Sequence, residues 1–225
     1  MSFETICSNC GAPSSPTVGI CPFCKATMTN KKSKESPTII KIKELYEKGD
    51  IQQALFLARE AEKSKEKLLK NSSFVSLYVK ILIEADAPSS KMKSLLTNAL
   101  LNNIENAELA EYREIIEAKN NLSHIKNDEG EQALVNILRR SPKNVHALFI
   151  LGSHLCWVEA EYVRAIQLLE RCVALRPKWL RANGCLAALY DKIDNTSLVD
   201  KYVRKCVSLA KDDKTKEYFK GLLKG

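Results

Sequence analysis

From Thr38 onward the apolar residues recur three and four positions apart, with polar residues between them. This spacing is typical of amphipathic helices. The pattern is interrupted by short polar or proline-containing segments, which mark turns. It predicts a helix ending before Gly49-Asp50, a second helix after that turn, helices over 74–84 and 91–101, another pair over 106–125 and 129–140, helix pairs within 145–178 and 180–211, and a closing helix over 213–223.

An internal repeat of 34 residues supports this reading. Ala165, Leu169 and Cys172 become Val199, Val203 and Cys206 when shifted by 34 positions, so small or apolar character is kept. Further upstream, Leu151-Gly152 corresponds to Leu186-Ala187, after one extra residue in the turn around Trp157 to Tyr162. Small residues such as Gly152 let two helices approach closely.

These residues resemble the tetratricopeptide repeat (TPR), a helix-turn-helix unit of 34 residues. Positions 145–178 match its Leu-Gly, Ala and Pro pattern well, and positions 180–211 match moderately. The resemblance implies an all-α fold, a TPR-like right-handed α-solenoid of about five helix pairs over residues 38–225. Solenoids of this kind bind protein segments along an extended surface.

The resemblance also implies where a partner would bind. In the family the first helix of each unit lines the concave face. In this sequence the matching positions are His146, Phe149, Ser153 and Cys156 in one unit, and Arg181, Gly184, Ala188 and Asp191 in the next. Some members of the family hold a C-terminal carboxylate with Lys and Asn there, but neither type occurs among these eight positions. We therefore expect a mixed apolar and polar groove for a protein partner.

The first 28 residues have few apolar positions and a different chemistry. Cys7 and Cys10 form one CxxC pair, and Cys21 and Cys24 form another after ten intervening residues. Two such pairs supply the four thiolates that a structural zinc ion prefers, and they leave no open position for substrate. So small a module also needs a metal to fold. The spacing predicts one structural Zn²⁺ site, and iron at four thiolates stays an alternative.

The segment resembles the short bacterial zinc-ribbon family, in which a CxxCG knuckle is followed by about ten residues, a hydrophobic residue and CPxC. The matching residues here are Cys7, Cys10, Gly11, Ile20, Cys21, Pro22 and Cys24. The sequence departs from the family at Lys25, where a second glycine is common. This resemblance implies a small β-hairpin-like metal module over residues 1–28 and no particular function.

Charge and composition add a second hypothesis. The chain of 225 residues carries a formal net charge of +8, and residues 25–43 hold six lysines against one glutamate. Residues 29–37, with Lys31, Lys32 and Lys34, are interpreted as a flexible basic linker. A basic arm beside a zinc ribbon is also typical of proteins that contact nucleic acid or the ribosome, which is the alternative function. The Tyr and Trp residues fall at helical packing positions instead of forming an RNA-stacking platform.

The remaining residues give no pattern of catalysis. We expect Cys172, Cys206, Cys156 and Cys185 to be buried, and the three histidines have no metal-ligand spacing. The sequence contains no phosphate-binding loop and no HExxH motif. It has no signal peptide or long apolar span, so we expect a cytoplasmic protein. The sequence thus predicts a non-enzymatic scaffold or adaptor that binds a protein partner, with the ribbon as a second docking module.

Overall fold

The chain divides into two compact units, Met1–Pro37 and Thr38–Gly225. The computed structural model describes residues 5–6, 13–14, 36–64, 66–102, 104, 106–122, 127–157 and 161–223. In the first unit two short strands, β1 (Thr5–Ile6) and β2 (Pro13–Ser14), pair antiparallel. Thr5 lies opposite Ser14 and Ile6 lies opposite Pro13, so the chain reverses its direction between them.

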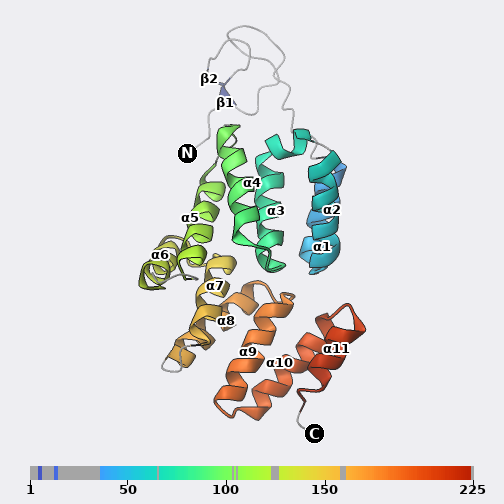
Figure 1. Cartoon of the computed structure of the whole chain (residues 1–225), viewed down its shortest axis with the longest axis vertical. Helices are drawn as coiled ribbons and strands as arrows, with labels where there is room; N and C mark the ends of the chain where they lie inside the picture. The colour runs from blue at the N-terminus through green and yellow to red at the C-terminus, as the bar shows by residue number, and fades with distance from the viewer. Residues whose placement is uncertain are drawn as a thin grey trace. The chain divides into compact units, whose positions relative to one another are not determined.

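From Pro37 onward the described residues form helices and turns (Figure 1). The elements in chain order are α1 (Pro37–Lys48), α2 (Ile51–Ser64), the 3₁₀ helix η1 (Glu66–Lys70), α3 (Ser72–Glu84), α4 (Ser89–Leu101), α5 (Ala107–Leu122), α6 (Asn127–Arg140), α7 (Val145–Leu155), α8 (Tyr162–Leu175), α9 (Leu180–Lys192), α10 (Thr196–Leu209) and α11 (Asp213–Lys220).

The predicted architecture of about five consecutive helix pairs and a closing helix is confirmed for the described residues from Pro37 onward. The sequence reading missed η1, a single short 3₁₀ segment. The closing helix ends at Lys220, three residues before the predicted end, where Gly221 follows as the C-cap. The right-handed superhelix stays a prediction.

Side-chain caps begin several of these helices. Asn71 accepts a hydrogen bond from the backbone N–H of Phe74, and Asn195 accepts one from Leu198. Asn144 and Asp212 cap α7 and α11 in the same way. Each cap satisfies a backbone donor that has no partner inside its helix, so these polar residues fix where the helices start.

Three turns between the two helices of a pair share one geometry. Gly49, Asp86 and Asp194 each take a positive φ, at 80°, 55° and 56° respectively. In each turn the next residue donates its N–H to a carbonyl five positions back, as from Ala87 to Leu82. This is the Schellman motif, in which a left-handed residue ends the helix. Asp tolerates that conformation better than most residues do, so two of the turns manage without glycine.

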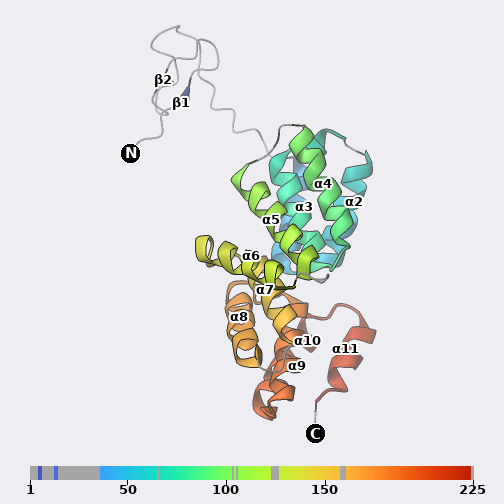
Figure 2. The same cartoon turned by 60° about the vertical axis from the view of Figure 1, so that its left-hand side comes forward.

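A continuous hydrophobic core runs from Ile39 to Val203. The helices of the pairs α7–α8 and α9–α10 pack closely, and α8 then packs against α9 (Figure 2). A Cβ atom at Gly152 would lie 2.8 Å from Cγ of Leu169. The expectation that this glycine lets two helices approach closely is therefore confirmed.

The sequence predicts no long apolar span, and the lengths and polarity of the helices bear on this expectation. Among the described residues, none of the helices combines the length and the apolar character that crossing a bilayer demands.

Candidate partner-binding site

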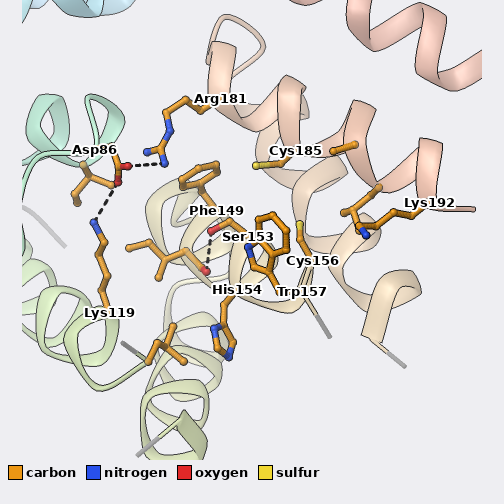
Figure 3. Close-up of a pocket in the computed structure, with 15 residues that line it drawn as sticks. Asp86, Lys119, Phe149, Ser153, His154, Cys156, Trp157, Arg181, Cys185 and Lys192 are labelled. Carbon is orange, nitrogen blue, oxygen red and sulfur yellow. Dashed lines mark hydrogen bonds and ion pairs between the residues drawn. The ribbon is translucent and has the colours of Figure 1, made fainter. Parts of the chain in front are cut away.

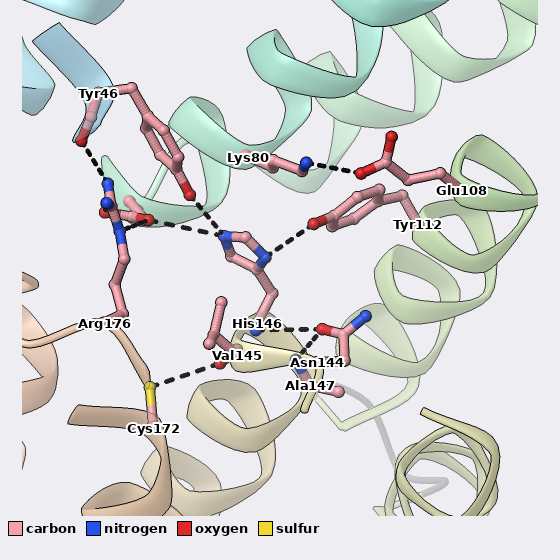
Figure 4. A network of polar contacts seen from close by, with 11 residues as sticks. Tyr46, Lys80, Glu108, Tyr112, Asn144, Val145, His146, Ala147, Cys172 and Arg176 are labelled. Atoms are coloured by element: carbon pink, nitrogen blue, oxygen red, sulfur yellow. Dashed lines mark hydrogen bonds and ion pairs between the residues drawn. The ribbon is translucent and has the colours of Figure 1, made fainter. Parts of the chain in front are cut away.

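A buried polar network lies among the odd-numbered helices (Figure 4). At its centre the Glu84 carboxylate at the end of α3 accepts a hydrogen bond of 2.9 Å from Nε of Arg176. Arg176 follows α8, and its guanidinium also donates to the backbone carbonyl of Tyr46 in α1, at 2.5 Å. The same guanidinium lies 3.9 Å from the centre of the Tyr46 ring. Arg176 thus joins the first helix pair to the fourth.

His146, the second residue of α7, lies next to this ion pair. Its Nδ1 is 2.9 Å from the hydroxyl of Tyr112 in α5, and its Nε2 is 3.7 Å from a Glu84 carboxylate oxygen. Burial lowers the pKa of His146 despite the nearby carboxylate. Arg176 already neutralises Glu84, so a second cation is not needed there. His146 is therefore neutral and forms part of a structural network.

The carboxyl group of Glu84 stays ionised in this interior. Burial raises its pKa, but the hydrogen bonds from His146 and Arg176 and the positive charge of Arg176 outweigh burial, and the net pKa is lowered. The Glu84 side chain has no exposed surface, and that of Arg176 is 14% exposed. A charge pair so enclosed is stabilising only while both partners are present.

This network fills the part of the predicted binding face that lies nearest to α1. The His146 residue is only 1% exposed, and its ring packs against Trp179 and Tyr112. Its side chain therefore belongs to the core and does not face a partner. The physical reason is that the end of α1 meets the α8–α9 turn, where Lys178 lies directly against Gly49.

A pocket of about 380 Å³ remains open further along the same helices (Figure 3). Its walls come from the end of α3, the end of α5, and one face each of α7 and α9. Phe149 lines it, and that ring packs against Trp179 with 4.2 Å between the ring centres. Because Trp179 is itself buried, the wall of the pocket is fixed by the core.

Charged side chains stand at one side of the pocket. The Asp86 carboxylate forms two ion pairs. One of its oxygens lies 3.0 Å from a guanidinium nitrogen of Arg181, and the other lies 3.6 Å from Nζ of Lys119. Arg181 also lies over the ring of Phe149, 5.3 Å from its centre. Lys192 lines the pocket as well. Three basic side chains and one acidic side chain therefore line the pocket, which favours a ligand with negative charge.

Trp157 is the most unusual residue of the pocket. It follows α7 in the turn toward α8, and it is 83% exposed. This corrects the interpretation that every tryptophan falls at a helical packing position, which holds for Trp179 only. A tryptophan that is exposed beside an apolar pocket is a side chain of the kind that dominates protein interfaces.

The sequence-predicted residues divide into those at the pocket and those elsewhere. Phe149, Ser153 and Arg181 line it, as do Cys156 and Ala188. Gly184 faces Phe219 of α11 instead, and a Cβ atom there would lie 3.5 Å from the Phe219 ring. Asp191 is exposed and does not line the pocket. The role of these residues in binding a partner stays a prediction.

Several pocket residues were missed by the sequence reading. Trp157 lies where the repeat carries an extra residue in its turn, and this irregularity was the available signal. Asp86 and Lys119 belong to earlier units that match the repeat only loosely. The binding-face positions of the family could therefore not be aligned with these units. Lys192 lies in the last turn of α9, one position beyond the last residue that was carried over.

The four cysteines of the helices are all free thiols. Cys172 and Cys206 are fully buried, as predicted, and burial raises the pKa of the Cys206 thiol to about 12. Cys156 is buried and Cys185 is half-buried, and both line the pocket. The first pair therefore serves packing, whereas the second pair lies where solutes reach.

The predicted zinc ligands Cys7, Cys10, Cys21 and Cys24 lie outside the described residues, as do Lys31, Lys32 and Lys34. Within the part of the chain that the structure describes, no group of three or more His, Cys, Asp or Glu side chains is placed to hold a metal ion. The zinc site and the basic linker both stay predictions.

No protein-family model matches the chain, and no curated protein matches it either. Among solved structures it is similar to YrrB, described as a TPR protein with an unusual peptide-binding site, at 14% identity over 85% of this chain and 94% of that one, with a TM-score of 0.42. It is also similar to MamA, at 16% identity over 76% of this chain and 91% of that one, with a TM-score of 0.41.

Proposed function

We propose that the chain is a non-enzymatic interaction protein that binds an acidic segment of a protein partner in the pocket between α7 and α9. One observation carries the proposal. A strongly exposed tryptophan, Trp157, stands beside an apolar pocket that also holds an excess of basic side chains. A surface of this composition gains free energy when a bulky apolar side chain covers it.

The size and the walls of the pocket suit this occupant. Its volume of about 380 Å³ lies within the range of roughly 300–1,000 Å³ that is typical of ligand pockets. Phe149 and Trp157 line it with aromatic rings, and Ile150 and Leu189 line it with aliphatic side chains. A partner's aromatic or long aliphatic side chain would bury this surface without leaving a polar group unpaired.

The charges give the proposal its chemical specificity. The carboxylate of Asp86 forms ion pairs with both Arg181 and Lys119. A carboxylate of the partner, one or two residues from its apolar anchor, would bind Arg181 or Lys192. Such charge-assisted hydrogen bonds are stronger than neutral ones. They would also raise the association rate at low salt.

Selection from a phage-displayed library of random peptides on the full chain tests this function. We expect enriched peptides to pair an aromatic or large aliphatic residue with Asp or Glu. Their affinity should fall at least about tenfold on Trp157→Ala, as for an interface hot spot. Phe56→Ala is the matched control, because Phe56 is also exposed but belongs to α2 and does not line the pocket. Equal binding to both variants would refute the proposed site.

We also propose that the first unit holds one structural Zn²⁺ through Cys7, Cys10, Cys21 and Cys24. The donor set supports this, since four thiolates match the preference of zinc. The pairing of β1 with β2 supports it further, because these strands flank the segment that contains Cys7 and Cys10. The ribbon would then act as a second docking module in addition to the helical unit.

A further inference from the structure

Cys156 and Cys185 come together in the pocket from different helices. Cys156 is the C-cap of α7, and Cys185 lies in the middle of α9, a helix that contacts α7. Figure 3 shows the two labelled side chains on neighbouring helices, both at the wall of the pocket. Both residues line the pocket, so small solutes reach the thiols without any opening of the core.

The two thiols differ in their surroundings. Cys156 is 9% exposed, and its Sγ lies 3.2 Å from the carbonyl oxygen of Gly152. Cys185 is less buried, and Arg181 precedes it by one helical turn on the same face. A thiolate at Cys185 would therefore have a cation nearby and an S–H donor opposite. Cys156 has a single S–H proton, which can turn from the Gly152 carbonyl to that thiolate.

These surroundings act on the acidity of the two thiols in opposite directions. A hydrogen bond from Cys156 and the positive charge of Arg181 lower the pKa of Cys185, and together they outweigh burial and the negative charge of Asp86, which raise it. The same hydrogen bond and burial raise the pKa of Cys156. A thiol with a lowered pKa, beside a second thiol, is the arrangement of a nucleophilic cysteine with its resolving partner.

We propose that Cys185 and Cys156 form a redox-active dithiol that closes to a disulfide across the wall of the pocket when it meets a hydroperoxide. The Cys185 thiolate attacks one peroxide oxygen, an S–O bond forms, the O–O bond breaks, and hydroxide leaves. The Cys156 sulfur then attacks the sulfur of the sulfenic acid, an S–S bond forms, and the S–O bond breaks. In sum, two thiols lose two electrons to one hydrogen peroxide, and two waters are released.

The disulfide would join α7 to α9 covalently beside Phe149 and Arg181. If the pocket binds a peptide as proposed above, oxidation would then change its affinity, and this consequence alone rests on the proposed function. Formation of the bond itself does not depend on any ligand. The two statements therefore need separate measurements.

Mass spectrometry of the full chain tests the bond directly. Each helical cysteine falls on its own tryptic peptide: 144–164 for Cys156, 172–178 for Cys172, 182–192 for Cys185 and 206–211 for Cys206. After brief treatment with hydrogen peroxide, alkylation and digestion without reductant, we expect a linked pair of 144–164 with 182–192, two hydrogens lighter than the sum. Peptides 172–178 and 206–211 should stay reduced.

Matched variants complete the test. Cys156→Ser should leave Cys185 as a sulfenic acid or a more oxidised form, whereas Cys172→Ala should leave the linked pair unchanged. Under native conditions iodoacetamide should modify Cys185 at least tenfold faster than Cys206. The proposal is overturned if Cys156 and Cys185 remain separate thiols while peroxide is consumed, or if Cys185 reacts no faster than Cys206. A peptide selected on the reduced chain, titrated against both forms, then measures the effect on binding.

Discussion

Single residues join helix pairs that lie far apart in the sequence. Arg176 contacts Glu84 and Tyr46, which are 92 and 130 positions away. The Glu84 side chain has no exposed surface, so its charge depends on this one partner and on nearby donors. At the scale of residues, the stability of the helical unit therefore rests on an enclosed ion pair more than on any of the surface pairs.

Removing the arginine tests this view. Arg176→Met should lower the free energy of unfolding by roughly 3–5 kcal/mol, because it leaves a buried carboxylate without its cation. Urea unfolding of the full chain, followed by circular dichroism, measures the change. The control is Arg140→Met, which breaks an exposed pair with Glu114 and should leave the midpoint unchanged. Equal effects of the two substitutions would contradict the role of the network.

The pH dependence of stability gives a second test at this scale. The pKa of His146 is lowered from its ordinary value of 6.5 in the folded chain. The unfolded chain therefore binds a proton at this residue as pH falls through 6.5, whereas the folded chain stays neutral. Stability is fully present above pH 6.5 and is lost below it, by at most about 1.4 kcal/mol per pH unit. Glu84 adds a loss in the same direction below 4.5, because its pKa is also lowered.

Urea midpoints between pH 7.5 and 5.5 measure this slope. The slope should flatten in His146→Gln, which removes the titrating ring, and it should persist in His154→Gln. The groups that surround His146 in this window are Glu84 and Lys80 of α3, Tyr46, Tyr112 and Arg176. A wild-type slope in His146→Gln would assign the acid sensitivity to other groups.

Helices are the scale at which the sequence was most informative. Their number and order followed from apolar spacing, and the close approach at Gly152 followed from the repeat pattern, because both depend on local packing within a pair. The closed end of the binding face did not follow. It depends on contact between the end of α1 and the α8–α9 turn, and no periodicity within one repeat encodes a contact between the first and fourth pairs.

Alanine substitutions at two glycines in neighbouring units distinguish the effect of packing on stability from the effect of helix propensity. Gly152→Ala should cost about 1–3 kcal/mol, because the new Cβ would meet Leu169 of the packed α8 at 2.8 Å. Gly184→Ala should instead stabilise the chain by about 0.5–1 kcal/mol, since the nearest atom is a ring carbon of Phe219 at 3.5 Å and alanine favours the helix. Thermal unfolding of both variants checks the opposite signs. Stabilisation by both substitutions would mean that α7 and α8 relax apart, and destabilisation by both would mean that Phe219 leaves no room for the new methyl group.

The whole molecule consists of two units with different requirements for folding. The helical unit has a continuous core, whereas the four predicted metal ligands all belong to the first unit. We expect one zinc per chain by elemental analysis, with its loss in Cys10→Ser and its retention in Cys185→Ser. Helicity by far-UV circular dichroism should stay nearly unchanged in both. Iron in place of zinc, or a large loss of helicity in Cys10→Ser, would contradict this division of roles.

The central claim is that a protein partner binds in the pocket between α7 and α9. Photocrosslinking in cells tests it most directly, with p-benzoylphenylalanine in place of Ala188, which is exposed and lines the pocket. The same amino acid in place of Phe56 serves as the control. The account predicts one discrete crosslinked partner from position 188, none from position 56, and loss of the crosslink on adding Trp157→Ala. The same products from both positions, or a crosslink that survives Trp157→Ala, would contradict it.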